Sequence, residues 1–302
     1  MRTRFLGDGG PEVSVVGLGT NNFGRRCDYE QTLAVIDAAL DAGVTLLDTA
    51  DIYGQGMSEE YIGRALEGRR DRVLIATKFG SEMDERPEER RGNPDYIRWA
   101  VEGSLRRLRT DVIDVYQMHQ PDPATPIVET LGALNDLVHE GKVRWIGSSN
   151  FSGEQIDAAE EVSRGAGFHR FVSAQNRYSL VERQAEDEIL PACESLRIGF
   201  LPYFPLASGL LTGKYRRGEE ATEGRLAGRE IPAEQWDRVD ALQRFAGERD
   251  VSLLDVAIGG LLAMPAVTCV IAGATKPEQV RANAAAGAWE PTDEDVSALQ
   301  AL

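Results

Sequence analysis

Residues 45–66 read TLLDTADIYGQGMSEEYIGRAL and contain one complete structural unit of the chain. The short apolar run 45–47 is typical of a buried strand, and the polar segment 48–54 follows it directly. Residues 58–66 then carry apolar side chains at three- and four-residue spacing, as a helix with one buried face requires. Two glutamates at the start of this helix suit the positive end of its dipole. The stretch therefore predicts a strand, a polar turn and a helix.

The same alternation continues in both directions from this stretch. Eight strand–helix units in succession favour a parallel β/α architecture, which closes either as a barrel or as a doubly wound open sheet. The expected strands are 14–18, 45–47, 73–76, 112–117, 143–146, 171–174, 199–201 and 267–271, and the expected helices are 29–41, 58–66, 94–108, 127–139, 152–163, 186–196, 252–262 and 277–285.

Two segments fall outside this alternation. Residues 4–6 and 12–14 predict a small hairpin before the first unit, in a position to plug the bottom of a barrel. Residues 212–235 are rich in glycine and charge, and predict a long surface loop over the top of the fold. A length of 302 residues suits one large domain or two small ones, and β/α barrels often reach this length as one unit, so we expect a single domain over residues 1–302.

The composition argues against several classes of partner. The formal net charge is −16. Such a surface repels nucleic acid phosphates and acidic lipids, so neither nucleic acid nor membrane is expected as a partner. No apolar run reaches the roughly 18 residues of a membrane span, and no apolar leader is evident near Met1. We expect a cytoplasmic protein.

Cysteine and histidine usage predicts no metal site. The chain has three cysteines, Cys27, Cys193 and Cys269, and they form no C-x-x-C pair. The three histidines show no ligand spacing of the H-E-x-x-H type. We expect three reduced and partly buried thiols.

Polar side chains follow three neighbouring strands where active sites of β/α barrels lie. These are Asp48 and Tyr53, then Lys78, then His119. A nearby ammonium lowers the pKa of a phenol, a carboxylate can hold that ammonium, and an imidazole can hydrogen-bond the oxygen that receives the proton. The set predicts protonation of a developing alkoxide as a hydride arrives. Taken alone, Asp48 and Lys78 could equally be a structural salt bridge.

Short stretches with recognisable sequences are spread across nearly the whole chain. The stretches are 16–24 (VGLGTNNFG), 47–54 (LDTADIYG), 76–78 (ATK), 114–122 (DVYQMHQPD), 146–151 (IGSSNF), 175–180 (QNRYSL), 202–214 (PYFPLASGLLTGK) and 271–283 (IAGATKPEQVRAN). In these stretches, and in their order, the sequence resembles the aldo-keto reductases. The resemblance implies a (β/α)₈ barrel, no metal, and NADPH bound in extended form across the top of the barrel.

The resemblance assigns roles residue by residue. The catalytic set falls on Asp48, Tyr53, Lys78 and His119, with Tyr53 as proton donor to an aldehyde or ketone. The implied cofactor contacts fall into five groups: Gly19, Thr20 and Asn21 beneath the cofactor, with Asp48 beside it; Ser149, Asn150 and Gln175 at the nicotinamide amide; Tyr203 against the nicotinamide ring; Pro205, Leu206, Ala207, Gly209 and Lys214 around the pyrophosphate; Gly273, Lys276, Gln279 and Asn283 at the adenosine end.

The sequence departs from the commoner family pattern in three places. Gln120 follows His119 where an aromatic residue is frequent, Ala272 replaces a usual proline, and Arg281–Ala282 stand where acidic residues are common. The last two changes touch the adenosine end. We therefore predict NADPH as the cofactor and keep NADH as the alternative. Plausible neighbours of the substrate are Tyr29, Ile52, Phe79, Gln120 and the loop 212–235.

Other functions remain open beside carbonyl reduction. A non-catalytic NADP(H)-binding sensor or channel-associated subunit could use the same fold, since fold does not dictate function. A barrel lyase or isomerase could use Lys78 as a Schiff base. A Rossmann fingerprint is not supported, because Gly17, Gly19 and Gly24 have the spacing G-x-G-x-x-x-x-G.

Overall fold

The computed structural model describes residues 1–83, 90–219 and 224–302. Its centre is an eight-stranded parallel sheet in the order β10-β3-β4-β5-β6-β7-β8-β9. The strands are β3 (Val16–Gly19), β4 (Leu46–Asp48), β5 (Leu74–Phe79), β6 (Ile113–Met118), β7 (Val143–Ser149), β8 (Phe171–Gln175), β9 (Gly199–Phe200) and β10 (Val270–Gly273). The last of them begins three residues later than the sequence predicts.

The sheet closes on itself between β9 and β10. Parallel bridges join Phe200 to Val267 and Tyr203 to Ile271. The Ile271 amide donates a hydrogen bond to the Pro202 carbonyl at 3.0 Å. Of the two closures that the sequence permits, the barrel is therefore the one observed.

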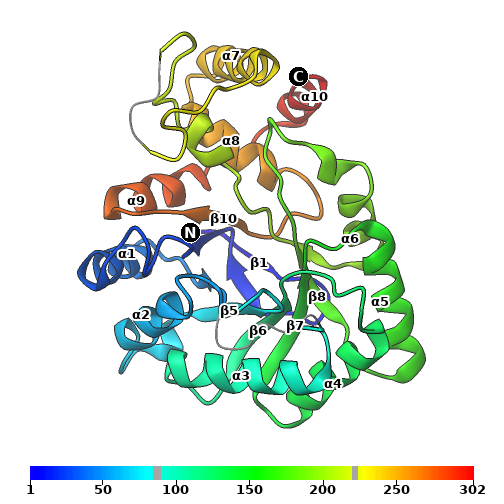
Figure 1. Cartoon of the computed structure of the whole chain (residues 1–302). Helices are drawn as coiled ribbons and strands as arrows, with labels where there is room; N and C mark the ends of the chain where they lie inside the picture. Colours follow the sequence, from blue (N-terminus) through cyan, green and yellow to red (C-terminus); the bar gives the residue numbers. More distant parts are fainter. Residues whose placement is uncertain (84–89, 220–223) are drawn as a thin grey trace.

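Helices surround the strands (Figure 1). Sequence signals explain several helix starts: the Asn93 side chain accepts a hydrogen bond from the Tyr96 amide at 2.9 Å, and Pro94 occupies the first turn. The α-helices are α1 (Tyr29–Asp41), α2 (Met57–Ala65), α3 (Pro94–Leu108), α4 (Ile127–His139), α5 (Gly153–Ala166), α6 (Ile189–Leu196), α7 (Ala233–Glu248), α8 (Leu253–Leu262), α9 (Pro277–Ala286) and α10 (Asp293–Ala301), and the short 3₁₀ helices are η1 (Arg70–Arg72), η2 (Gln184–Glu186) and η3 (Ala207–Thr212). Within the described residues, no helix is long and apolar enough to cross a membrane.

Two helices are absent from the sequence prediction. The predicted loop 212–235 ends early, because α7 begins at Ala233 and buries Trp236 and Val239. Residues 220–223 of that loop lie outside the described residues. Helix α10 begins with a capping box between Thr292 and Asp295 and buries only Leu299. Both helices lie outside the regular strand–helix alternation, on which the prediction depended.

The predicted N-terminal hairpin is confirmed. Strands β1 (Thr3–Phe5) and β2 (Glu12–Ser14) pair antiparallel, and β1 lies across the centre of the ring of strands in Figure 1. Leu6 and Val13 are fully buried in one cluster with Leu46 and Val115 from the barrel strands. The hairpin therefore supplies side chains to the barrel interior, as a plug does, and leaves the opposite end of the barrel for the site.

Candidate active site

A cavity of about 440 Å³ lies at the carboxyl ends of the barrel strands. This volume falls in the usual range for small-molecule sites, roughly 300–1,000 Å³. The cavity brings together most of the residues that the sequence predicts for catalysis and cofactor binding: Gly19, Thr20, Asn21, Asp48, Tyr53, His119, Ser149, Asn150, Gln175, Tyr203, Pro205, Leu206, Gly209, Lys214, Gly273, Gln279 and Asn283. The other three predicted residues, Lys78, Ala207 and Lys276, are not among its lining residues.

Lys78 lies behind the cavity wall as part of a buried ion pair. Its side chain is fully buried on β5, and that of Asp48 at the end of β4 is 4% exposed. The Lys78 Nζ atom donates to Asp48 Oδ1 at 2.7 Å and to the Thr49 carbonyl at 2.7 Å. The Gln175 amide donates to the same carboxylate oxygen at 2.8 Å. These contacts fix the positive and the negative charge in place below the phenol of Tyr53.

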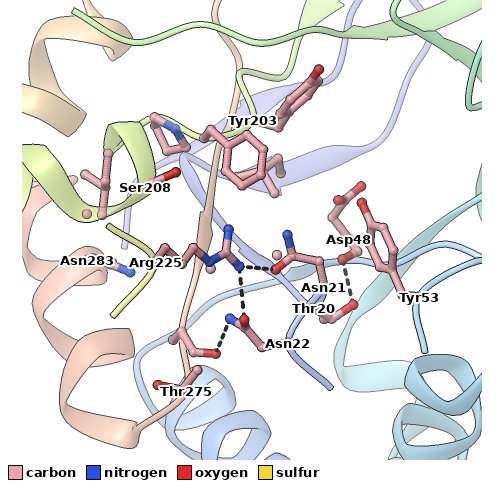
Figure 2. A pocket seen from close by; sticks show the side chains of 18 of the residues that line it. Thr20, Asn21, Asn22, Asp48, Tyr53, Tyr203, Ser208, Arg225, Thr275 and Asn283 are labelled. Carbon is pink, nitrogen blue, oxygen red and sulfur yellow. Dashed lines mark hydrogen bonds between the residues drawn. The ribbon is translucent and has the colours of Figure 1, made fainter. Parts of the chain in front are cut away.

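The Tyr53 ring stands beside Asp48 at the edge of the cavity (Figure 2). The Lys78 Nζ atom lies 5.4 Å from the centre of this ring. Burial raises the pKa of Tyr53 above its ordinary value of 10.0, and the Asp48 carboxylate raises that pKa further. The predicted lowering of the pKa by Lys78 is therefore wrong for this structure. Burial is the larger cause, and the Asp48 carboxylate acts in the same direction, so together they outweigh any effect of the Lys78 ammonium on this pKa.

His119 lies next to Tyr53, directly after the end of β6. The two rings meet edge to face with centroids 6.0 Å apart. Burial, followed by the charge of Lys78, lowers the pKa of His119 to about 3. The imidazole is therefore neutral at physiological pH. A neutral imidazole carries one ring hydrogen and can donate one hydrogen bond to a carbonyl oxygen.

Amide and hydroxyl groups cover the wall formed by β7, β8 and the segment after β9. The Tyr203 hydroxyl donates to Asn150 Oδ1 at 2.7 Å, and Asn150 Nδ2 donates to the His119 carbonyl at 2.9 Å. Asn150 has a φ of +60°, in the left-handed region. Ser149 and Gln175 line the cavity beside it. This wall therefore presents hydrogen-bonding groups and one aromatic ring beside the candidate catalytic side chains.

The segment after β9 has a strained backbone where it borders the cavity. Phe204, Ala207 and Ser208 have φ angles of 53°, 45° and 60°, and Gly209 has a φ of 97°. Left-handed non-glycine residues cost about 1–3 kcal/mol each, and they cluster at functional sites. A Cβ atom built on Gly209 would lie 3.5 Å from the Lys214 Nζ atom. Lys214 is therefore held close to this bend.

The predicted adenosine end lies at the start of α9. Gly273, Gln279 and Asn283 line the cavity there. The Gln279 side chain accepts a hydrogen bond from the Thr275 amide at 2.8 Å. Lys276 is the residue before the first turn of α9 and is exposed. Its predicted contact with a 2′-phosphate therefore stays a prediction.

The cavity also has lining residues that the sequence does not mark individually. Arg225 is the most prominent: its Nη2 atom donates to Asn21 Oδ1 at 2.6 Å and to Asn22 Oδ1 at 3.0 Å (Figure 2). Its guanidinium carbon lies 5.2 Å from the centre of the Phe204 ring. No motif marks it, since it lies in the predicted loop 212–235. The lining residues not named individually are Asn22, Arg26, Phe204, Ser208, Thr212, Gly224, Arg225, Ile271, Ala274 and Thr275. Thr212, Gly224 and Arg225 among them belong to the loop 212–235, which is expected beside the substrate.

The structure places only some of the predicted substrate neighbours at the cavity. Gln120 and part of the loop 212–235 line it, whereas Tyr29, Ile52 and Phe79 do not. Phe79 is fully buried and stacks on Tyr116 with centroids 4.8 Å apart, so its assignment as a substrate neighbour is wrong. Tyr29 packs edge to face on Tyr61 and is not among the lining residues of the cavity. Phe79 is the last residue of β5, and successive side chains of a strand point alternately into the barrel and toward the helices, so a position near the strand end does not by itself place a side chain in the cavity.

No group of three or more potential metal ligands occurs among residues 1–83, 90–219 and 224–302. The three cysteines are buried and free. Burial raises the pKa of the Cys193 thiol to about 12 and also raises that of Cys269. These thiols are therefore protonated at neutral pH, and they resemble small core residues more than ligands.

Fold and cavity together define the class of protein: a (β/α)₈ barrel with a polar site at the carboxyl ends of its strands. Residues 15–302 match the model of the Aldo/keto reductase family. The chain belongs to the aldo/keto reductase family.

Individual relatives agree with this assignment. Aldo-keto reductase YhdN of Bacillus subtilis (strain 168) is 38% identical over 309 residues, which cover 98% of this chain and 91% of that protein. The structure of aldo-keto reductase AKR11C1 from Bacillus halodurans (holo form) is similar with a TM-score of 0.82 and 31% identity, covering 100% of this chain and 96% of that one. A probable voltage-gated potassium channel subunit beta of Oryza sativa subsp. japonica is 34% identical over 298 residues, covering 94% of this chain and 90% of that protein. Most of these similarities support an oxidoreductase.

Proposed function

We propose that this protein reduces an aldehyde or ketone to an alcohol, with NADPH as hydride donor and Tyr53 as proton donor. The observation that carries the proposal is the convergence of Tyr53, His119 and the buried Asp48–Lys78 pair on one cavity. These groups come from the ends of three adjacent strands, where a carbonyl can contact both the phenol and the imidazole.

The lining chemistry supports a dinucleotide cofactor in the same cavity. At one end, amide and hydroxyl groups of Ser149, Asn150 and Gln175 suit a carboxamide, and the Tyr203 ring suits a flat heterocycle. Three cations, Arg26, Lys214 and Arg225, border the remainder of the cavity, and phosphates prefer such partners. The residues present therefore fit an amide, an aromatic ring and a pyrophosphate. When bound, a reduced nicotinamide supplies the hydride that the protein's own side chains lack.

The protein's side chains would then handle the oxygen of the substrate. Neutral His119 donates a hydrogen bond that orients the carbonyl and polarises it. As negative charge develops on the oxygen, the Tyr53 hydroxyl gives up its proton to that oxygen. The raised pKa of Tyr53 keeps the phenol protonated until that moment. An alkoxide is a much stronger base than a phenolate, so the transfer remains downhill, and the Lys78 ammonium lies close enough to stabilise the phenolate.

The preference for NADPH over NADH rests on the start of α9. A helix N-terminus attracts a phosphate, and Lys276 adds a positive charge beside it. Arg281 lies in the same helix and is exposed, which places a second cation nearby. Both features favour the additional 2′-phosphate of NADPH.

Replacement of Tyr53 by phenylalanine tests the proposal. General acid catalysis contributes about 10²–10⁴-fold, so the kcat of Tyr53→Phe should fall by that factor. Binding of NADPH, followed by the quenching of tryptophan fluorescence, should be unchanged. Tyr61→Phe on α2 is a matched control, since it removes a phenol that is not among the lining residues of the cavity. Normal carbonyl reduction by Tyr53→Phe would refute Tyr53 as proton donor.

A non-catalytic role is the second candidate, because one relative is named as a probable channel subunit. The two functions differ in turnover. A panel of aldehydes and ketones, assayed by nicotinamide absorbance with NADPH and with NADH, should show multiple turnovers. Tight NADPH binding without oxidation of the cofactor by any carbonyl would favour the sensor role instead.

A further inference from the structure

One contact of the candidate site has no part in the function proposed above. The Ser81 hydroxyl lies 3.0 Å from Nδ1 of His119. Ser81 follows β5 and His119 follows β6, so the contact joins two neighbouring strand ends. It engages the ring nitrogen that a substrate bound at Nε2 would not touch.

The backbone of Ser81 is fixed by α3. The Tyr96 hydroxyl donates to the Ser81 carbonyl at 2.9 Å. Tyr96 is fully buried in the first turn of α3, where its amide is capped by the Asn93 side chain. A buried phenol from a capped helix therefore holds Ser81 in place beside the imidazole.

The backbone of His119 is fixed from two other directions. Its amide donates to the Phe79 carbonyl at 2.8 Å, and its carbonyl accepts from Asn150 Nδ2 at 2.9 Å. Since the ring is neutral at physiological pH, it carries one hydrogen, on either Nδ1 or Nε2. Because the backbone of His119 is fixed, the nitrogen that carries the hydrogen determines whether the ring can donate a hydrogen bond to a carbonyl oxygen.

We propose that Ser81 is a positioning residue, which donates its hydroxyl hydrogen to His119 Nδ1 and so keeps the ring hydrogen on Nε2. The inference rests on the proposed function, in which His119 Nε2 faces the carbonyl oxygen. A carbonyl oxygen only accepts hydrogen bonds, so the Nε2–H tautomer binds it and the Nδ1–H tautomer repels it. In the reverse arrangement Nδ1–H would donate to Ser81, and a bare Nε2 lone pair would face the substrate.

Loss of the hydroxyl removes this selection. In Ser81→Ala the two tautomers compete freely, and a part of the population presents the wrong nitrogen. A single neutral hydrogen bond is worth about 0.5–1.5 kcal/mol, which corresponds to a fall in kcat of up to about tenfold. Binding of NADPH should not change, because Ser81 is not among the residues that line the cavity.

Nitrogen NMR reads the tautomer directly. The chain has three histidines, so the His139→Gln, His169→Gln background leaves His119 as the sole imidazole. Both replaced histidines are exposed. In protein labelled with ¹⁵N-histidine, with and without NADP⁺, we expect an acceptor-type Nδ1 shift and a protonated-type Nε2 shift. Ser81→Ala should move both shifts toward their average, and Ser81→Thr should restore the original values and the kcat.

A matched control and two outcomes complete the test. Ser297→Ala removes an exposed hydroxyl on α10 and should leave both the tautomer and the kcat unchanged. An Nδ1–H tautomer in the unmodified background, or identical His119 shifts in Ser81→Ala, would overturn the role of Ser81. Absence of carbonyl reduction by the unmodified protein would count against the proposed function alone, because the NMR measurement decides the tautomer without turnover.

Discussion

The buried pair of Asp48 and Lys78 predicts a strong and measurable coupling. Removal of one partner from a buried ion pair costs about 3–5 kcal/mol, because the other charge remains uncompensated. In Lys78→Met the Asp48 carboxylate keeps the Gln175 hydrogen bond at 2.8 Å, so the lower end of the range, about 3 kcal/mol, is expected. In Asp48→Asn the Lys78 ammonium keeps the Thr49 carbonyl at 2.7 Å, and a similar cost of about 3 kcal/mol is expected.

The double variant Asp48→Asn/Lys78→Met removes both charges together. Replacement of a buried pair by neutral groups of similar size is often close to neutral. The double variant should therefore lose far less than the roughly 6 kcal/mol that the two single variants lose together, with a coupling free energy of at least about 3 kcal/mol. Urea unfolding at 25 °C, followed by tryptophan fluorescence and linear extrapolation, measures all four proteins.

The unfolding measurement needs no turnover, so it does not depend on the proposed function. All three variants should lack turnover. Arg98→Met with Asp136→Asn is a control cycle, because that pair is exposed and its coupling should stay below about 1 kcal/mol. If the losses in the free energy of unfolding caused by Asp48→Asn and Lys78→Met are additive, the two buried charges do not compensate each other in the folded protein.

Three further predictions concern other parts of the molecule. The pKa of His119 is lowered from 6.5 to about 3, so between these pH values the unfolded state binds more protons than the folded state. The free energy of unfolding should therefore fall as the pH drops, by up to about 1.4 kcal/mol per pH unit. Urea titrations at several pH values should show this slope for the unmodified protein, and His119→Gln should lack this part of it. Lys276→Ala should raise the Kd for NADPH about tenfold and that for NADH little, as measured by fluorescence titration; equal effects would remove the 2′-phosphate role. Thr292→Ala should lower the free energy of unfolding by about 1 kcal/mol through loss of the α10 cap while kcat is unchanged, and a loss of turnover would link α10 to the site.

The barrel could be predicted from the sequence because its signal is repetitive. A strand period and a helix period alternate along the chain, and each of the eight helices in this alternation starts or ends within a few residues of its predicted position. Helix α7 also has a readable signal, with Trp236, Val239 and Leu242 three residues apart, but it interrupts the alternation. Helix α10 buries only Leu299, so periodicity could not reveal it. The assignment of residues 1–302 to one domain stays a prediction.

The sequence could predict which residues of the candidate site lie together only for residues at the ends of strands. Asp48, Lys78 and His119 lie at the carboxyl ends of adjacent parallel strands, so their proximity follows from topology. Arg225 reaches the cavity through a long segment whose path no local pattern encodes. The direction of the Tyr53 pKa shift depends on burial, and the contact between Ser81 and His119 joins residues 38 positions apart. The roles of the predicted site residues stay predictions until the variants above are measured.

The plug formed by the N-terminal hairpin has a consequence for the order of assembly. The Arg4 guanidinium donates to the Leu262 carbonyl at 2.8 Å and to the Val267 carbonyl at 2.6 Å, and the two contacts span 258 and 263 residues. Leu6 needs Cys269 and Leu201 as neighbours in the same interior cluster. During synthesis the N-terminal hairpin therefore leaves the ribosome first, but it can form these contacts only after residues near β10, the last strand, have been made. Contacts of such long range slow folding, so the base of the barrel should be among the last regions to become protected from hydrogen exchange.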